Sequence, residues 1–178
     1  MSDKFKLLLK QIHFPQHEEA YNEIKSGSIE SVKLFKSKRQ WFFVFSFRNL
    51  LSYETFTLFD NLLHSSFDSL GAKVSYMINV EDISCDQSLL EAYFSYALDI
   101  LKSSHFSIYS LFSNLGIEIS NNSISVKAPA HILRENLHER FIALIADVLS
   151  NVGLSNVSIS VLEDKEASSS LEEAYETN

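Results

Sequence analysis

Hydrophobic and polar positions run through the same order of periods twice along the chain. Helical spacing of apolar residues comes first, then a pair of short alternating runs, then a longer helical stripe and a last alternating run. The first pass occupies residues 1–82 and the second occupies residues 83–164. This order predicts an α+β fold of two small tandem modules, each arranged as helices, hairpin, helix and strand.

In the first module, helical spacing predicts a short amphipathic helix over 3–12 and a second helical piece within 16–25. Residues 28–35 and 40–47 alternate with the period of a β-strand, and a short polar turn at 37–39 separates them. These two runs predict a β-hairpin.

A longer helix and a strand complete the first module. Ser52 is the expected N-cap of a helix whose apolar stripe extends to Phe67, and Gly71 is expected to end it in the left-handed conformation. Residues 74–78 alternate again and predict the third strand.

The returning strand of this hairpin is apolar on both faces. Trp41 and Phe43 point one way, whereas Phe42 and Val44 point the other. Such a strand is either central and covered on both sides, or it presents one face to a partner.

The second module opens with a helix that Asp86 is expected to cap and continues with a helical piece over 108–115. A compact hairpin over 117–126 follows, with its turn at Asn121 and Asn122. Asparagine tolerates the positive φ that two-residue hairpin turns require, so we expect that conformation here.

One uninterrupted helical stripe is predicted over 133–152, ending at Gly153, and the strand 157–161 closes the second module. Residues 165–178 contain three consecutive serines and several glutamates, which is typical of a flexible acidic linker.

Composition indicates a folded protein in a reducing compartment. Of the 178 residues, 46% are hydrophobic and 14 are Phe, which is enough apolar surface for buried cores. Cys85 is the only cysteine, so no disulfide within the chain is possible. Neither a signal peptide nor an apolar run long enough to span a membrane is evident, so we expect a cytoplasmic protein without a membrane partner.

The net charge of −8 is unevenly distributed. Residues 1–82 are neutral overall, residues 83–162 carry −3 and residues 163–178 carry −5. The chain as a whole is therefore not expected to attract phosphate groups.

The motifs of common catalytic and metal sites are missing from the sequence. The six histidines lack metal-ligand spacing, and neither a nucleophile elbow nor a glycine-rich phosphate loop occurs. The acidic pairs at 81–82 and 163–164 end the two closing strands, where adjacent side chains point to opposite faces. We therefore predict no catalytic residue, no metal ligand and no cofactor.

The candidate binding site is the basic and aromatic hairpin turn of the first module. Its residues are Lys33, Lys36, Lys38, Arg39 and Trp41. Cations beside aromatic rings can grip a nucleic-acid backbone and stack bases, or they can engage an acidic protein partner around an aromatic anchor. A solvated hairpin tip beside a core strand is the third interpretation. The residues alone leave these three alternatives open.

Four segments give the chain a resemblance to a known family. They are the opening run at 4–8, the Lys38-Arg39-x-Trp41-x-Phe43 hairpin, the Asn79-x-Glu81-Asp82 strand end and the acidic segment after Glu163. Residues 1–164 resemble the extreme N-terminal region of the PolC-type DNA polymerase III alpha subunit of Gram-positive bacteria.

This resemblance implies a region of a replicative polymerase that synthesises and proofreads DNA. It implies a first module like the alpha-binding domain of the clamp-loader tau subunit and a second module like a type II KH domain. The Gly-x-x-Gly loop by which KH domains hold the nucleic-acid backbone is missing from the sequence. The expected role is a non-catalytic one, tethering the polymerase to replisome proteins such as tau. The alternative is an accessory module that contacts DNA.

Overall fold

The computed structural model describes residues 3–166, and these fall into two compact units. The first contains the residues up to Ser84 together with Ser150–Leu154, and the second contains Cys85–Leu149 and the residues from Ser155 onward. Of the acidic linker predicted over 165–178, only Lys165 and Glu166 belong to the described residues.

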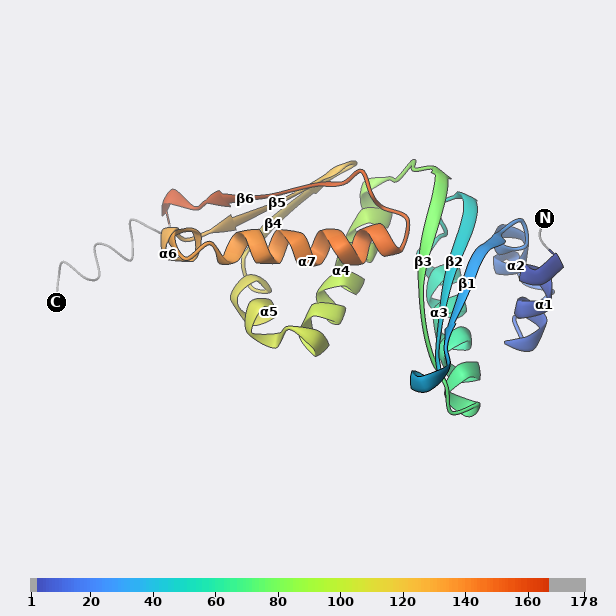
Figure 1. The fold of residues 1–178 in the computed structure, drawn as a ribbon. Coiled ribbons are helices and arrows are strands. Elements are labelled where there is room, and N and C mark those ends of the chain that lie inside the picture. Colours follow the sequence, from blue (N-terminus) through green and yellow to red (C-terminus); the bar gives the residue numbers. More distant parts are fainter. Residues whose placement is uncertain (1–2, 167–178) are drawn as a thin grey trace. The chain divides into compact units, whose positions relative to one another are not determined.

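Each unit folds into helices and one three-stranded sheet, so the predicted α+β class is confirmed (Figure 1). The first unit contains α1 (Asp3–Gln11), α2 (Glu19–Ile24), β1 (Ser28–Phe35), the 3-10 turn η1 (Lys36–Lys38), β2 (Gln40–Asn49), α3 (Tyr53–Ser69) and β3 (Lys73–Asp82). The second contains α4 (Gln87–Ser104), α5 (Phe106–Phe112), β4 (Gly116–Ser120), β5 (Ser123–Ala128), α6 (Ala130–Arg134), α7 (Leu137–Asn151) and β6 (Ser158–Glu163). The last two residues of α7 are assigned to the first unit.

The two sheets share one topology. In the first, the strand order is β1-β2-β3, with β1 antiparallel and β3 parallel to the central strand β2. In the second, the order β4-β5-β6 repeats this arrangement. The parallel strand follows a helix in both units, because a chain cannot return parallel to itself through a tight turn. The repeated sequence pattern therefore reflects a repeated topology.

Aromatic side chains dominate the core of the first unit. Phe43, Phe45 and Phe47 on β2 are buried, and the ring of Phe45 meets Phe5 of α1 at 5.8 Å and Phe59 of α3 at 5.2 Å between centroids. Both helices therefore cover the same face of the sheet. β2 is the central strand, as the first of the two alternatives expected, but its other face is not fully covered, because Phe42 and Val44 there are only half-buried.

Gly27 is required by close packing. A Cβ atom at this position would lie 2.4 Å from a ring carbon of the buried Phe47. An aromatic ring in a packed core has no free rotamer to accept such a shift.

Gly27→Ala should lower the free energy of unfolding of the first unit by about 1–3 kcal/mol, the usual cost of overpacking. Trp41 is the only tryptophan, so its fluorescence in a urea titration reports this unit. Ser26→Ala is the matched control in the same unit, since the Ser26 side chain next to Gly27 is exposed. Equal stability of the two variants would contradict the packing argument.

The helix boundaries predicted from capping residues are confirmed. The Ser52 hydroxyl accepts from the backbone N–H of Thr55, and the Asp86 carboxylate accepts from that of Leu89 at 2.7 Å. Gly71 follows α3 with φ of 67°, the left-handed conformation expected at this position.

Two local expectations in the second unit were wrong. The single stripe over 133–152 is divided into α6 and α7 by Asn136, which adopts φ of 56°, a conformation that asparagine tolerates. Asn121 and Asn122 are not among the described residues with positive φ. The Asn122 carbonyl accepts a hydrogen bond from Ser158 at the start of β6, so pairing with the third strand also constrains this turn.

Candidate functional site

The basic turn joins β1 to β2 through η1 and a left-handed residue. Arg39 has φ of 47°, its N–H donates to the Lys36 carbonyl at 3.3 Å, and its own carbonyl accepts from Lys73 of β3 at 2.9 Å. The first bond closes the turn and the second fastens it to β3, so Lys36, Lys38 and Arg39 are held at one end of the sheet.

All four predicted cations are exposed. Within residues 3–166, no hydrogen bond or ion pair engages the side chains of Lys33, Lys36, Lys38 or Arg39. The Arg39 guanidinium lies near the turn after α3, where a Cβ at Gly71 would be 3.8 Å from its Nη1 atom. This position at a helix C-terminus is electrostatically favourable for a cation.

Trp41 does not point into solvent with these cations. Its ring stacks on Phe43 at 6.2 Å and meets Phe67 of α3 edge-on at 5.9 Å, and it is half-buried. Lys33 pairs with Phe42 and therefore lies on the opposite face of the sheet from Trp41. The structure brings three of the predicted residues together at the turn and separates Lys33 and Trp41 onto two faces.

Sequence reasoning missed the most unusual feature of this surface, the exposed apolar side chains of β1. Val32, Leu34 and Phe35 are 42%, 44% and 48% exposed. Val32 and Leu34 share the helix-covered face of the sheet with Phe43 and Trp41, their partners in β2. Alternation alone predicted a strand here. Only the strand order, which leaves β1 at the edge, could have shown that it is uncovered.

A shallow apolar groove adjoins this surface. It measures about 370 Å³ and lies between the C-terminal ends of α1 and α3, where Leu8, Ile12, His13, Phe67 and Leu70 line it. Phe67, which lines the groove, also contacts the Trp41 ring of β2.

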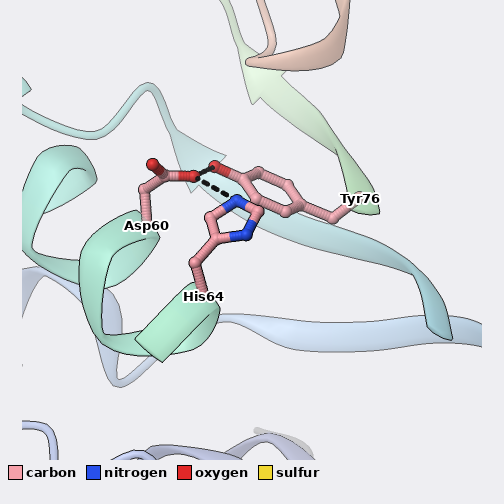
Figure 2. A network of polar contacts seen from close by, with 3 residues as sticks. All are labelled: Asp60, His64 and Tyr76. Atoms are coloured by element: carbon pink, nitrogen blue, oxygen red, sulfur yellow. Dashed lines mark hydrogen bonds and ion pairs between the residues drawn. The ribbon is translucent and has the colours of Figure 1, made fainter. Parts of the chain in front are cut away.

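The polar cluster of the first unit joins α3 to β3 (Figure 2). The Tyr76 hydroxyl donates to Oδ1 of Asp60, and His64 Nε2 lies 3.2 Å from the same oxygen. The hydrogen bond to Asp60 raises the pKa of His64, burial opposes this effect, and the charges of Asp60 and Asp68 add to it. These contacts tie a helix to the sheet, which is a structural role.

The raised pKa of His64 predicts a small pH dependence of stability. A pKa raised by folding stabilises the protein fully below the unfolded value near 6.5 and loses this effect as pH rises through the folded value. His64→Gln should therefore destabilise more at pH 5.5 than at pH 8.5, by about 0.2–1 kcal/mol for a half-exposed pair. Urea titrations at the two pH values, followed by Trp41 fluorescence, measure this difference in the free energy of unfolding. In an Asp60→Asn background most of this pH dependence should be lost, since only the charge of Asp68 then raises the pKa of His64, and an undiminished pH dependence would contradict the assignment.

The second unit presents a different surface. A groove of about 560 Å³ lies between α4 and the edge strand β4, and its polar lining includes Gln87, Glu91 and Glu118. Lys127 lies 3.5 Å from the Glu118 carboxylate. The carboxylates make this groove unfavourable for a phosphate backbone.

Within residues 3–166, no three His, Cys, Asp or Glu side chains are grouped so that they could hold a metal ion. No helix in the same range has both the length and the apolar character that crossing a membrane requires.

Comparison with known proteins identifies two consecutive matches. Residues 4–78 match the family described as DNA polymerase III polC-type N-terminus I, and residues 92–178 match polC-type N-terminus II. No solved structure matches the chain.

Similar proteins named DNA polymerase III PolC-type come from several streptococci. The chain is 26% identical over all 178 residues to that of Streptococcus agalactiae strain NEM316 and 27% identical over 163 residues, 90% of the chain, to that of Streptococcus suis strain 98HAH33. It spans 12% and 11% of the lengths of these two relatives, respectively.

Proposed function

Because the chain belongs to the PolC-type DNA polymerase III family, whose N-terminus I and N-terminus II regions it carries in order, we propose that it is a non-catalytic protein-binding region of a replicative polymerase. The parent protein is then a cytoplasmic DNA-directed DNA polymerase with 3′–5′ exonuclease activity. The region tethers that enzyme to other replisome proteins, with the clamp-loader tau subunit as the partner to test first.

The observation that carries this proposal is the mixed surface of β1 and its turn. Exposed Val32, Leu34 and Phe35 lie directly beside four exposed cations. Val32 and Leu34 are neighbours on one face of this strand, and exposed apolar side chains that gather in one place often mark a protein-binding surface. A surface that combines apolar contacts with a cationic rim is suited to a protein partner with acidic residues.

The proposal includes two structural relationships. The first unit is related to the alpha-binding domain of tau, and the second is related to type II KH domains. The repeated topology of two hairpins, each extended by a parallel strand, supports a common small α+β plan. The second unit lacks the Gly-x-x-Gly loop, so its role need not include the KH mode of nucleic-acid binding.

Calorimetric titration of the chain with the clamp-loader tau subunit tests the tethering role. We expect saturable binding that weakens by about tenfold or more when Lys36, Lys38 and Arg39 are all changed to Glu, because charge pairs at an interface are coupled. The matched control reverses three other exposed cations of the same unit: Lys4, Lys10 and Lys25. Absence of heat and of co-elution at micromolar concentrations would refute tau as the partner.

Direct DNA contact is the second candidate, and the four exposed cations favour it. With all of them on phosphates, the slope of log affinity against log salt concentration would be about −3 to −4. Trp41 packs on Phe43 and Phe67 and so is poorly placed to stack bases, and the second unit offers a groove with Glu91 and Glu118. Fluorescence anisotropy with labelled single-stranded and duplex DNA over a salt series distinguishes the candidates. Binding without this slope would eliminate the DNA hypothesis.

A further inference from the structure

We propose that the free edge of β1 binds an extended acidic and apolar segment of a partner protein as an added fourth strand. This inference rests on the proposed function and names its binding mode. It starts from the strand order, in which β1 pairs with β2 on one side only. The other side of β1 therefore presents backbone N–H and C=O groups that an extended peptide can pair with.

The regular part of this edge is short and well defined. A β-bulge interrupts the register between Ile29 and Ser31, and the ladder then runs without a break to the pair of Phe35 with Gln40. A docked segment thus has five residues, 31–35, available for regular pairing, followed by the basic turn.

Exposed apolar groups lie on both faces of this edge. Val32 and Leu34 lie on the helix-covered face, whereas Phe35 lies on the other face with Lys33. Natural edge strands are usually protected by being polar or charged. Here Lys33 is the only charged residue of the regular ladder, so the edge repels cationic segments and admits acidic ones.

The side chains that face the edge define the segment that fits it. An added strand places alternate residues on the two faces, so every second residue meets Val32 and Leu34, and the residues between them meet Lys33. The best occupant therefore alternates aliphatic residues with Glu or Asp. Lys36, Lys38 and Arg39 at the turn provide further attraction for the acidic side chains.

The test uses a fluorescein-labelled decapeptide in which Glu alternates with Val and Ile. Its binding is measured by anisotropy against the 178-residue chain up to about 1 mM protein. Two further peptides carry backbone N-methyl groups, one on every Glu and the other on every aliphatic residue. Each removes the N–H donors of one peptide edge only. We expect the two methylated peptides to differ in affinity by about tenfold or more, because only one edge pairs with β1. Equal affinities, or no binding of the unmethylated peptide, would overturn the inference.

Variants locate the peptide on the protein. Leu34→Asp should weaken binding about tenfold, since a carboxylate then meets the aliphatic residues and repels the acidic ones. The matched control is Leu162→Asp, because Leu162 is 53% exposed on β6, an edge strand of the second sheet. If Leu162→Asp weakened binding as much as Leu34→Asp, the peptide would not bind specifically at β1.

Charge exchange makes the test independent of folding defects. In a Lys33→Glu, Lys36→Glu variant, the Glu peptide should bind more weakly, and a peptide with Lys in place of Glu should bind more tightly than it binds the original chain. If this variant still preferred the Glu peptide to the Lys peptide, the role assigned to the cations would be contradicted. A dimer in light scattering that Leu34→Asp dissociates would assign the edge to a second copy of the chain instead.

Different results would refute the tethering role and the addition of a strand at β1. If tau binds the chain but Leu34→Asp and Lys33→Glu leave that affinity unchanged, the tethering role stands and strand addition at β1 is wrong. If the alternating peptide binds with the expected edge preference but tau does not bind, the edge site stands and tau is the wrong partner.

Discussion

Phe5→Ala should remove about 3–5 kcal/mol from the free energy of unfolding of the first unit, the cost of deleting a buried aromatic ring. The Phe5 side chain is fully buried, and its ring lies 5.8 Å from Phe45, 5.7 Å from Phe47 and 6.1 Å from Phe59 between centroids. Deleting it leaves a cavity between α1 and β2 and ends several edge-to-face contacts at once. Because small domains have a total stability of only about 5–15 kcal/mol, we expect a large shift of the urea midpoint of Trp41 fluorescence.

The matched control for this variant lies on the same helix. Leu7→Ala removes a large apolar side chain that is exposed, so it should change stability by about 0.5 kcal/mol or less. A loss at Leu7 as large as that at Phe5 would mean that α1 contributes through its exposed side and not through the aromatic core.

Much of the fold could be predicted because its signals are local. The β-period over 28–35 matches the observed bounds of β1, and the caps at Ser52 and Asp86 start α3 and α4 where expected. Alternation, capping side chains and glycine at helix ends depend on neighbouring residues, so a single sequence contains them.

The candidate site was harder to predict because it depends on which strands pair. The basic residues were visible in the sequence, but the exposure of Leu34 and the partial burial of Trp41 follow from the order β1-β2-β3. A hairpin strand becomes an edge only because β3 pairs with β2 instead of β1. That choice is made by tertiary packing between residues far apart in the chain.

Glu23 shows the same limit at the start of α3. Its carboxylate accepts from the Ser52 hydroxyl at 2.9 Å and also from the Thr55 hydroxyl at the start of α3. Ser52 was predicted as the cap, but a carboxylate reaching it from α2, 29 residues earlier, has no sequence signature. A negative charge at this helix N-terminus is favourable, so α2 helps to fix the start of α3.

The two units use one topology for different surfaces. In the first, the edge strand β1 is apolar and is followed by Lys36, Lys38 and Arg39. In the second, the corresponding edge strand β4 borders a groove with Glu91 and Glu118. Since opposite charges attract different ligands, the two copies are expected to bind different partners.

Phe141→Ala should destabilise the second unit by about 3–5 kcal/mol. The rings of Phe112 and Phe141 stack at 4.3 Å between centroids with an angle of 10°, and both side chains are fully buried, so this pair joins α5 to α7. Hydrogen exchange of the α4, α5 and α7 amides measures the effect without relying on Trp41, which lies in the first unit. Phe106→Ala is the control, because that ring is exposed on the same helix as Phe112. If both variants accelerated exchange equally, the stability of this unit would reside in the surface of α5 and not in the stacked pair.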